Sequence, residues 1–142
     1  GACESLFCYQ KFNLRKCVII MELIKKLNPD FAFEDERGTL FQITHTPYGQ
    51  TNAIFTKKGA VRGGFHYHKE TKELFFVISG KVRVCVKLGD NREEHVFESG
   101  DMFMIGENVR HSFEYLDDTY LVAFYTSCVE KDDGSKDIFP DG

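Results

Sequence analysis

Apolar and polar side chains alternate in short runs from about Phe31 onward, and these runs are rich in Phe, Val, Ile, Thr and Tyr. A period of two places successive side chains on opposite faces of a strand, so the pattern predicts half-buried β-strands. Turn residues such as Ser79-Gly80 and Ser99-Gly100 separate the runs at intervals typical of sandwiches and barrels. The predicted strands are 31–35, 39–45, 52–56, 60–67, 73–79, 81–88, 93–98, 102–105, 111–116 and 119–127. We therefore expect an all-β chain, a double-sheet jelly roll closed into a barrel.

The two ends of the chain depart from this pattern. Apolar residues between Ile20 and Leu27 recur at helix-like spacing before Asn28-Pro29 ends the pattern, although the same stretch also fits an edge strand. The segment from Val129 to Gly142 is polar and has no periodicity, which predicts a surface excursion or partial disorder.

Composition and charge narrow the possible partners. The 142 residues are 42% hydrophobic, which is enough for the core of one domain. The net charge is −4 and no cluster of Lys and Arg occurs, which argues against nucleic acid or an anionic membrane as a partner. The longest apolar run, Cys17 to Leu23, contains Glu22 and is far shorter than the roughly 20 residues of a spanning helix. We expect a soluble protein that binds small molecules or proteins.

The cysteines indicate a reducing compartment. They are five, an odd number, and form no Cys-x-x-Cys pair, so neither a disulfide framework nor a cysteine zinc site is expected. This favours the cytoplasm. Three of them precede Met21, in a segment without the features of a secretory signal. We interpret residues 1–20 as an N-terminal extension or an artificial addition, and residues 21–142 as a single domain that begins at a natural start, Met21.

Candidate chemistry is concentrated around His66, His68 and Glu73. Residues two apart on a strand share a face, so both imidazoles are expected to point to the same side. Glu73 opens an otherwise apolar run and needs a partner if it is buried. With the distant His111, the set has three imidazoles and one carboxylate, which suits a divalent transition metal such as Zn, Fe, Mn, Ni or Co. The alternative is that the two histidines are exposed and that Glu73 pairs with a nearby lysine.

Two more residues share these faces. Arg62 alternates onto the face of the histidine pair, where it either grips a ligand oxygen or makes a structural salt bridge. Tyr115 alternates onto the face of His111, where it either acts as a proton donor or is a core tyrosine with a satisfied hydroxyl. His45 and His95 lie outside this pattern and are expected to be surface or structural histidines.

The spacing resembles the two motifs of the cupin superfamily. Between Gly59 and Gly80 the order is His-x-His, four residues, Glu, six residues and Gly, and the second motif runs from Gly100-Asp101 to His111. Gly106 stands where the family usually has Pro, and Asn108 where it has Gly, so the turn remains plausible. The resemblance implies a cupin barrel, also called a double-stranded β-helix, with a short N-terminal extension. Its implied metal ligands are His66, His68, Glu73 and His111.

A tighter resemblance covers roughly Phe31 to Thr126. The segments Asp35-Glu36-Arg37-Gly38-Thr39-Leu40 and Arg62-Gly63-Gly64-Phe65-His66-Tyr67-His68-Lys69 are similar to those of the sugar-nucleotide-modifying cupins. These are the dTDP-sugar ketoisomerases, the deoxysugar 3,5-epimerases and the cupin domain of capsular polysaccharide-synthesis reductases. The resemblance implies a nucleotide-linked keto-sugar as substrate and proton abstraction next to a carbonyl.

The same resemblance implies roles for individual residues. His66 or His68 is the base, Arg62 holds a phosphate or carbonyl oxygen, and Tyr115 is the acid. A histidine bound to a metal cannot also be a free base, so these roles compete with ligation. Glu73 stands where ketoisomerases tend to carry an amide, which brings this chain nearer to the metal-holding capsular branch.

We therefore expect an isomerase or epimerase of nucleotide-sugars in polysaccharide biosynthesis that binds a divalent transition metal. The alternatives are a metal-dependent dioxygenase of a small organic acid and a non-catalytic cupin that binds a small ligand. A homodimer is expected, because a partner commonly covers the open sheet edges of such barrels.

Overall fold

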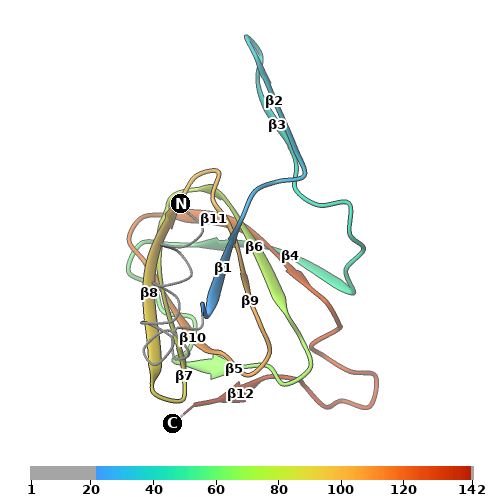
Figure 1. Ribbon diagram of the computed structural model, residues 1–142, viewed down its shortest axis with the longest axis vertical. Helices are drawn as coiled ribbons and strands as arrows, with labels where there is room; N and C mark the ends of the chain where they lie inside the picture. Colours follow the sequence, from blue (N-terminus) through green and yellow to red (C-terminus); the bar gives the residue numbers. More distant parts are fainter. Residues whose placement is uncertain (1–21, 142) are drawn as a thin grey trace, which may run out of the picture.

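Antiparallel strands make up the regular structure of residues 22–141, the part of the chain that the computed structural model describes (Figure 1). One sheet has the order β1-β9-β6-β11-β4 and the second the order β12-β5-β10-β7-β8, while β2 and β3 form a separate hairpin. This confirms the predicted all-β jelly roll. The strands are β1 (Ile24–Leu27), β2 (Phe31–Asp35), β3 (Gly38–Gln42), β4 (Gln50–Thr56), β5 (His66–Tyr67), β6 (Glu73–Ser79), β7 (Lys81–Leu88), β8 (Asn91–Glu98), β9 (Met102–Ile105), β10 (Arg110–Tyr115), β11 (Thr119–Tyr125) and β12 (Phe139–Pro140).

The core lies between the two five-stranded sheets. From β7, the alternating side chains Val82, Val84 and Val86 point inward and are fully buried. From the facing sheet, Phe75 and Val77 of β6 pack into the same core. Such alternation is what a sheet with one face toward the interior requires, so hydrophobic burial fixes the register of these strands.

The outer face of the β6 sheet is also apolar. Leu74 and Phe76 point away from the core, yet both are buried, because the chain before β4 crosses over them. Ile43 and Tyr48 of this crossing segment pack against them. The sequence of β6 is therefore a continuous apolar run, as expected for a strand covered on both faces.

The strand that leads into the histidine pair is much shorter than predicted. The prediction of a strand over 60–67 is wrong for 60–65, and only His66–Tyr67 is a strand. Gly59 and Gly63 have φ values of +78° and +71°, which extended strands do not have, so the chain turns here instead of extending. The expected alternation of Arg62 with the histidines along one strand therefore does not apply.

Two alternatives were predicted for each end of the chain, and the structure agrees with one of them at each end. For the described part of 20–27, the helix is wrong and the edge strand is confirmed, because β1 lies at the edge of its sheet and pairs with β9. The predicted extension at 1–20 lies outside the described residues. For the segment from Val129, the surface excursion is the expectation that holds, since residues 130–136 are exposed; the segment then returns to the barrel, where Asp137 is buried and β12 pairs with β5.

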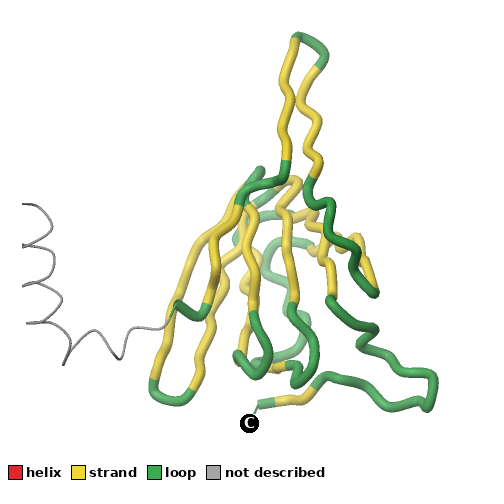
Figure 2. Tube along the Cα trace, turned by 45° about the vertical axis from the view of Figure 1, so that its right-hand side comes forward, coloured by secondary structure: helices red, strands yellow, loops and turns green. Residues whose placement is uncertain are grey.

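The hairpin β2–β3 projects from one end of the barrel, while β5, β12 and the C-terminus lie at the other end (Figures 1 and 2). The hairpin contacts the barrel through Phe41, which packs against Phe76 with ring centroids 5.1 Å apart. None of the described residues belongs to a helix with the length and apolar character needed to cross a lipid bilayer.

Candidate metal centre

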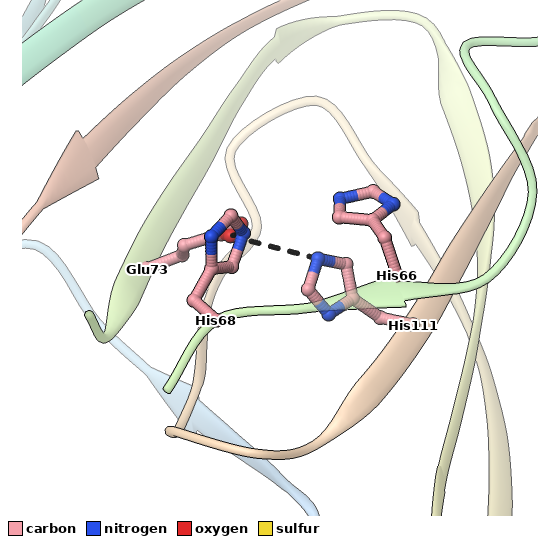
Figure 3. A group of neighbouring side chains, drawn as sticks. All are labelled: His66, His68, Glu73 and His111. Atoms are coloured by element: carbon pink, nitrogen blue, oxygen red, sulfur yellow. Dashed lines mark ion pairs between the residues drawn. The ribbon is translucent and has the colours of Figure 1, made fainter. Parts of the chain in front are cut away.

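Three histidines and a glutamate converge inside the barrel, on elements from both sheets (Figure 3). His66 of β5 lies directly opposite His111 of β10, and their rings are 4.3 Å apart. His68 follows β5, where its carbonyl accepts a hydrogen bond from the Asn108 backbone N–H, at 2.7 Å. Glu73 is the first residue of β6 in the other sheet. The structure thus brings together all four residues that the spacing singles out.

The four side chains are close enough to share one ion. One candidate ligand atom from each lies within 4.8 Å of the other three. Glu73 Oε1 is 3.5 Å from His111 Nε2 and in direct contact with His68 Nε2. His68, Glu73 and His111 are buried, whereas His66 is only half-buried and faces the cavity.

Backbone carbonyls orient all three imidazoles in the same way. Nδ1 of His66 lies 3.2 Å from the Gly64 carbonyl, and Nδ1 of His111 lies 3.0 Å from the Val109 carbonyl. Nδ1 of His68 lies 2.6 Å from the Asp137 carbonyl. A carbonyl only accepts, so each Nδ1 carries the hydrogen, and in a neutral ring the Nε2 lone pair points into the site. Metal-binding histidines are commonly held in this way.

The resulting donor set fits a cation. His68 Nε2, Glu73 Oε1 and His111 Nε2 are buried and have no hydrogen-bond partner among the described residues. If both imidazoles are neutral, the lone pairs of two ring nitrogens and a carboxylate oxygen face one another. Burying these atoms without a hydrogen-bond or metal partner costs folding free energy. Either a proton on a histidine or a metal ion resolves this. Two imidazoles and one carboxylate with an open side are a known arrangement for Zn²⁺ and for Fe²⁺.

Charge and burial shift the pKa values in the site. Burial raises the pKa of Glu73, but His111 and His68 outweigh it and lower that pKa to about 2. Burial lowers the pKa of His68, yet contact with Glu73 outweighs this and the net shift is upward. Burial and the neighbouring His111 both lower the pKa of His66. His66 is therefore neutral at pH 7 and free to accept a proton.

A cavity of about 260 Å³ opens over the four residues. Gln50, Asn52 and Arg62 contribute polar groups to its wall, while Phe75 and Leu121 contribute apolar ones. Pockets that enclose a whole drug-sized ligand have roughly 300–1,000 Å³, so this cavity suits a smaller unit such as a single sugar ring. The rest of a larger ligand would lie outside the mouth.

Arg62 is fixed beside the cavity by β4. Its Nε donates to Thr56 Oγ1 and its Nη2 to the Phe55 carbonyl, both at 2.7 Å. The alternative of a structural salt bridge is not realised, since Arg62 forms no ion pair within residues 22–141. A guanidinium has five N–H donors, so three stay available for a ligand oxygen.

Two tyrosines line the cavity. Tyr115 is buried and, as expected, on the same face as His111 and Phe113. Burial raises the pKa of Tyr115, although Thr56 and Arg62 act in the opposite direction. Tyr125 was not predicted: burial and the Glu73 charge raise its pKa to about 12. Its alternation with the core residues of β11 is the signal that could have placed it inside the barrel, but nothing in the sequence links it to the site.

Asp137 is the second functional candidate that the sequence did not reveal. Its carboxylate accepts hydrogen bonds from the backbone N–H groups of Lys69 and Glu70, at 2.8 and 3.0 Å, and from the Thr71 hydroxyl, at 2.7 Å. Its carbonyl accepts from His68. One residue of the C-terminal segment therefore fixes both the loop before Glu73 and the ring of His68.

The two remaining histidines are separate from the centre, as predicted. His45 is exposed, with Nδ1 3.1 Å from Asp30. His95 lies on β8 with Nε2 2.9 Å from Glu93.

Solved structures share this fold at low sequence identity. The TDP-quinovose 3,4-ketoisomerase WlaRB from Campylobacter jejuni is 20% identical, with a TM-score of 0.68 over 82% of this chain and 94% of the other. A double mutant of the 3,4-ketoisomerase QdtA from Thermoanaerobacterium thermosaccharolyticum is 18% identical, with a TM-score of 0.71 over 86% of this chain and 90% of the other. The dTDP-4-dehydrorhamnose 3,5-epimerase from Sulfolobus tokodaii is 22% identical, with a TM-score of 0.60 over 74% and 76%.

Sequence comparison gives the family. No curated protein matches the chain. The family described as the Cupin domain matches residues 55–127, just over half of the chain, and that range includes His66, His68, Glu73 and His111. The fold and the two motifs agree with this match. The chain belongs to the cupin family.

Proposed function

We propose that this cupin isomerises or epimerises a nucleotide-linked keto-sugar by moving a proton next to its carbonyl. The observation that carries the proposal is the separation of roles within the four-residue cluster. Three buried groups offer donor atoms that have no hydrogen-bond partner among the described residues, and the fourth, His66, faces the cavity with a lowered pKa. Low-identity structural similarity to 3,4-ketoisomerases and a 3,5-epimerase supports the substrate class.

In this proposal His68, Glu73 and His111 hold a divalent transition metal. A bound ion of this kind acts as a Lewis acid toward a carbonyl oxygen. The chain contributes the geometry: the Asp137 and Val109 carbonyls fix the tautomers, and the sheets bring the carboxylate from β6 to the histidines at β5 and β10. His66 completes the predicted set of ligands only when it does not serve as the base.

His66 is the base in this proposal. Its Nδ1–H is engaged by Gly64, so the free Nε2 lone pair is available for a proton from the carbon beside the carbonyl. Tyr115 is the acid on the cavity wall, and its raised pKa keeps its hydroxyl protonated at pH 7. The three free donors of Arg62 hold an oxygen of the substrate. The cavity encloses the sugar ring, and the nucleotide lies at its mouth.

Proton exchange with solvent tests the reaction. A suitable probe is TDP-4-keto-6-deoxyglucose, which is bound in a structure of a variant of the Thermoanaerobacterium ketoisomerase. In D2O, NMR should detect deuterium at the carbon next to the carbonyl, with no consumption of oxygen. Oxygen uptake with Fe(II) instead would favour the dioxygenase alternative. If no nucleotide-sugar exchanges or raises the melting temperature, a non-catalytic ligand-binding role is favoured.

Two variants separate the base from the ligands. His66→Gln should lower the exchange rate by about 10²–10⁴-fold, the usual contribution of a general base, and should keep the metal content measured by elemental analysis. Glu73→Gln should lose the metal. His95→Gln is the matched control, because this histidine lies outside the cavity and should alter neither quantity. Unchanged exchange in His66→Gln would remove His66 from the proposed mechanism.

A further inference from the structure

The outer face of the sheet that contains β5 carries a row of three cations. Arg110 of β10 lies directly opposite Lys87 of β7, and Lys87 lies directly opposite Arg92 of β8 (Figure 1). Residues paired in this way share a face of the sheet. Val86 and His111, the chain neighbours of Lys87 and Arg110, are buried inside the barrel, so the three cationic side chains point outward. We call these three residues the cation row.

Three like charges on neighbouring strands need a counter-charge, because like charges that lie directly opposite each other destabilise a sheet. Within residues 22–141, the one carboxylate that pairs with the cation row is that of Asp141. Its oxygens lie 3.0 Å from Lys87 Nζ and 3.6 Å from Arg110 Nε. Arg92 is exposed and forms no ion pair in the same part of the chain. The row therefore has three positive charges for one negative charge.

Another cation on the same face is fully compensated. Arg83 lies on β7 before Lys87, and the alternation of the strand points both side chains to the same side. The Nε of Arg83 is 3.0 Å from Glu94 on β8, and its Nη1 is 2.7 Å from Glu114 on β10. The two strands that flank β7 thus supply carboxylates for Arg83, whereas beside Lys87 they supply two further cations.

Aromatic rings hold the cationic side chains in place. Lys87 Nζ and Arg92 Cζ lie 4.2 and 5.8 Å from the centroid of the Phe65 ring. Arg110 Cζ lies 3.7 Å from the centroid of the Tyr67 ring. A cation over a ring face is attracted to it, which restricts the long side chain. An anion that binds the row therefore loses less conformational entropy than it would on freely moving side chains.

We propose that the cation row binds a small ligand with two or three linked phosphate groups. Lysine and arginine donate readily to phosphate oxygens, and neighbouring strands are about 4.8 Å apart, so a row across three strands suits linked phosphates better than a single one. A long polyanion such as nucleic acid fits less well, because Glu94 and Glu114 lie further along the same face and the net charge of the chain is −4. The cavity is on the opposite side of this sheet, so the inference stands independently of the proposed reaction.

Asp141 competes with such a ligand for two of the three cations. Its carboxylate lies between Lys87 and Arg110, and its backbone N–H donates to the Phe65 carbonyl at 2.9 Å, which keeps the residue beside the row. A phosphate group that binds both cations must displace this carboxylate. Removing the carboxylate should therefore tighten phosphate binding, whereas removing a cation of the row should weaken it.

Titration calorimetry with tripolyphosphate at fixed ionic strength tests the site. Lys87→Gln should raise the dissociation constant at least about tenfold, because a hydrogen bond to a charged group is lost. Asp141→Asn should lower the constant by about two- to fivefold, the equivalent of one partly exposed ion pair. Arg83→Gln removes the same charge from the same face and is the matched control. It should leave the constant unchanged, since at physiological salt charges more than about 8–10 Å apart are largely screened.

Further measurements identify the ligand class and the location of the site. Orthophosphate should bind at least about tenfold more weakly than tripolyphosphate, because it reaches fewer of the three cations. Glu73→Gln, which should lack the metal, should keep its affinity for tripolyphosphate, so chelation at the metal centre is separated from binding at the row. Circular dichroism checks the fold of each variant. The proposal would be overturned by undetectable binding, by equal weakening in Lys87→Gln and Arg83→Gln, or by tighter binding of a single-stranded oligonucleotide.

Discussion

Individual residues show where sequence patterns suffice and where they do not. The spacing of His66, His68 and Glu73 is informative because strand alternation and a short turn determine where these side chains point. Asp137 lies 69 residues after His68 in a polar, aperiodic segment, and its role comes from tertiary contacts alone. Such a carboxylate resembles any surface aspartate in the sequence, because only burial distinguishes it.

Asp137→Asn should destabilise the protein in a pH-dependent way. Burial raises the pKa of Asp137, but hydrogen bonds from Thr71, Lys69 and Glu70 outweigh it, so the folded pKa lies below the unfolded value of about 3.9. The carboxylate therefore contributes stability above pH 4, which is lost as the pH falls through the folded pKa. We expect a loss of about 1–3 kcal/mol in the free energy of unfolding at pH 7.

Urea unfolding at pH 7 and pH 3 measures this loss. The difference between wild type and Asp137→Asn should narrow at pH 3, while the exposed Asp132→Asn should show little difference at either pH. If the free energies of unfolding of wild type and Asp137→Asn differed equally at both pH values, the charge of Asp137 would not contribute to stability.

At the scale of elements, strand bounds are predicted most reliably from the sequence where one face of the strand is fully buried. The strand β7 was predicted with its observed bounds, because Val82, Val84 and Val86 alternate with polar residues and have no other favourable orientation. The strand β5 was overextended because its preceding glycines were treated as strand residues, although glycine adopts positive φ without steric cost. Hydrophobic periodicity predicts which side chains of a strand are buried, but it does not predict where the backbone turns.

The turn between β6 and β7 should tolerate no side chain at Gly80. Its φ is +99°, and an added Cβ would lie 2.3 Å from the Asp118 carbonyl oxygen and 2.6 Å from the Thr119 Cα. Because both contacts are with backbone, the neighbouring turn must move. We expect Gly80→Ala to lower the free energy of unfolding by about 2–4 kcal/mol, from backbone strain and overpacking.

Gly89→Ala is the matched control. Gly89 also has a positive φ, +59°, but an added Cβ would have nothing within 4 Å. Thermal unfolding should therefore show a loss of about 1 kcal/mol from backbone conformation alone. Equal losses in both variants would mean that the close approach to the Asp118–Thr119 backbone is unimportant.

At the scale of the whole molecule, the candidate metal centre joins the two sheets. Glu73 comes from the β6 sheet, whereas His111 comes from the sheet of β5 and β10. An ion held between them would bind the folded barrel and not the unfolded chain, so it should raise stability by mass action. The melting temperature is therefore a measure of the site that does not depend on turnover.

Removal of metal by a chelator should lower the melting temperature. For an ion at about 100 times its dissociation constant, the stabilisation is about 2.7 kcal/mol, which corresponds to a shift of roughly 5–10 °C for a domain of this size. Adding Zn²⁺, Mn²⁺ or Fe²⁺ back should restore it. The Glu73→Gln variant should respond to neither treatment, and a response equal to that of the wild type would place the bound metal elsewhere.

Different residues of the C-terminal segment hold the loop after β5 and line the cavity. Asp137 anchors it, while its neighbour Ile138 and the more distant Glu130 line the cavity. Substitutions at Glu130 and Ile138 can thus reshape the entrance without disturbing the histidine that Asp137 orients. Under the proposed function, a library restricted to Glu130 and Ile138 is the natural starting point for changing which sugar the cavity accepts.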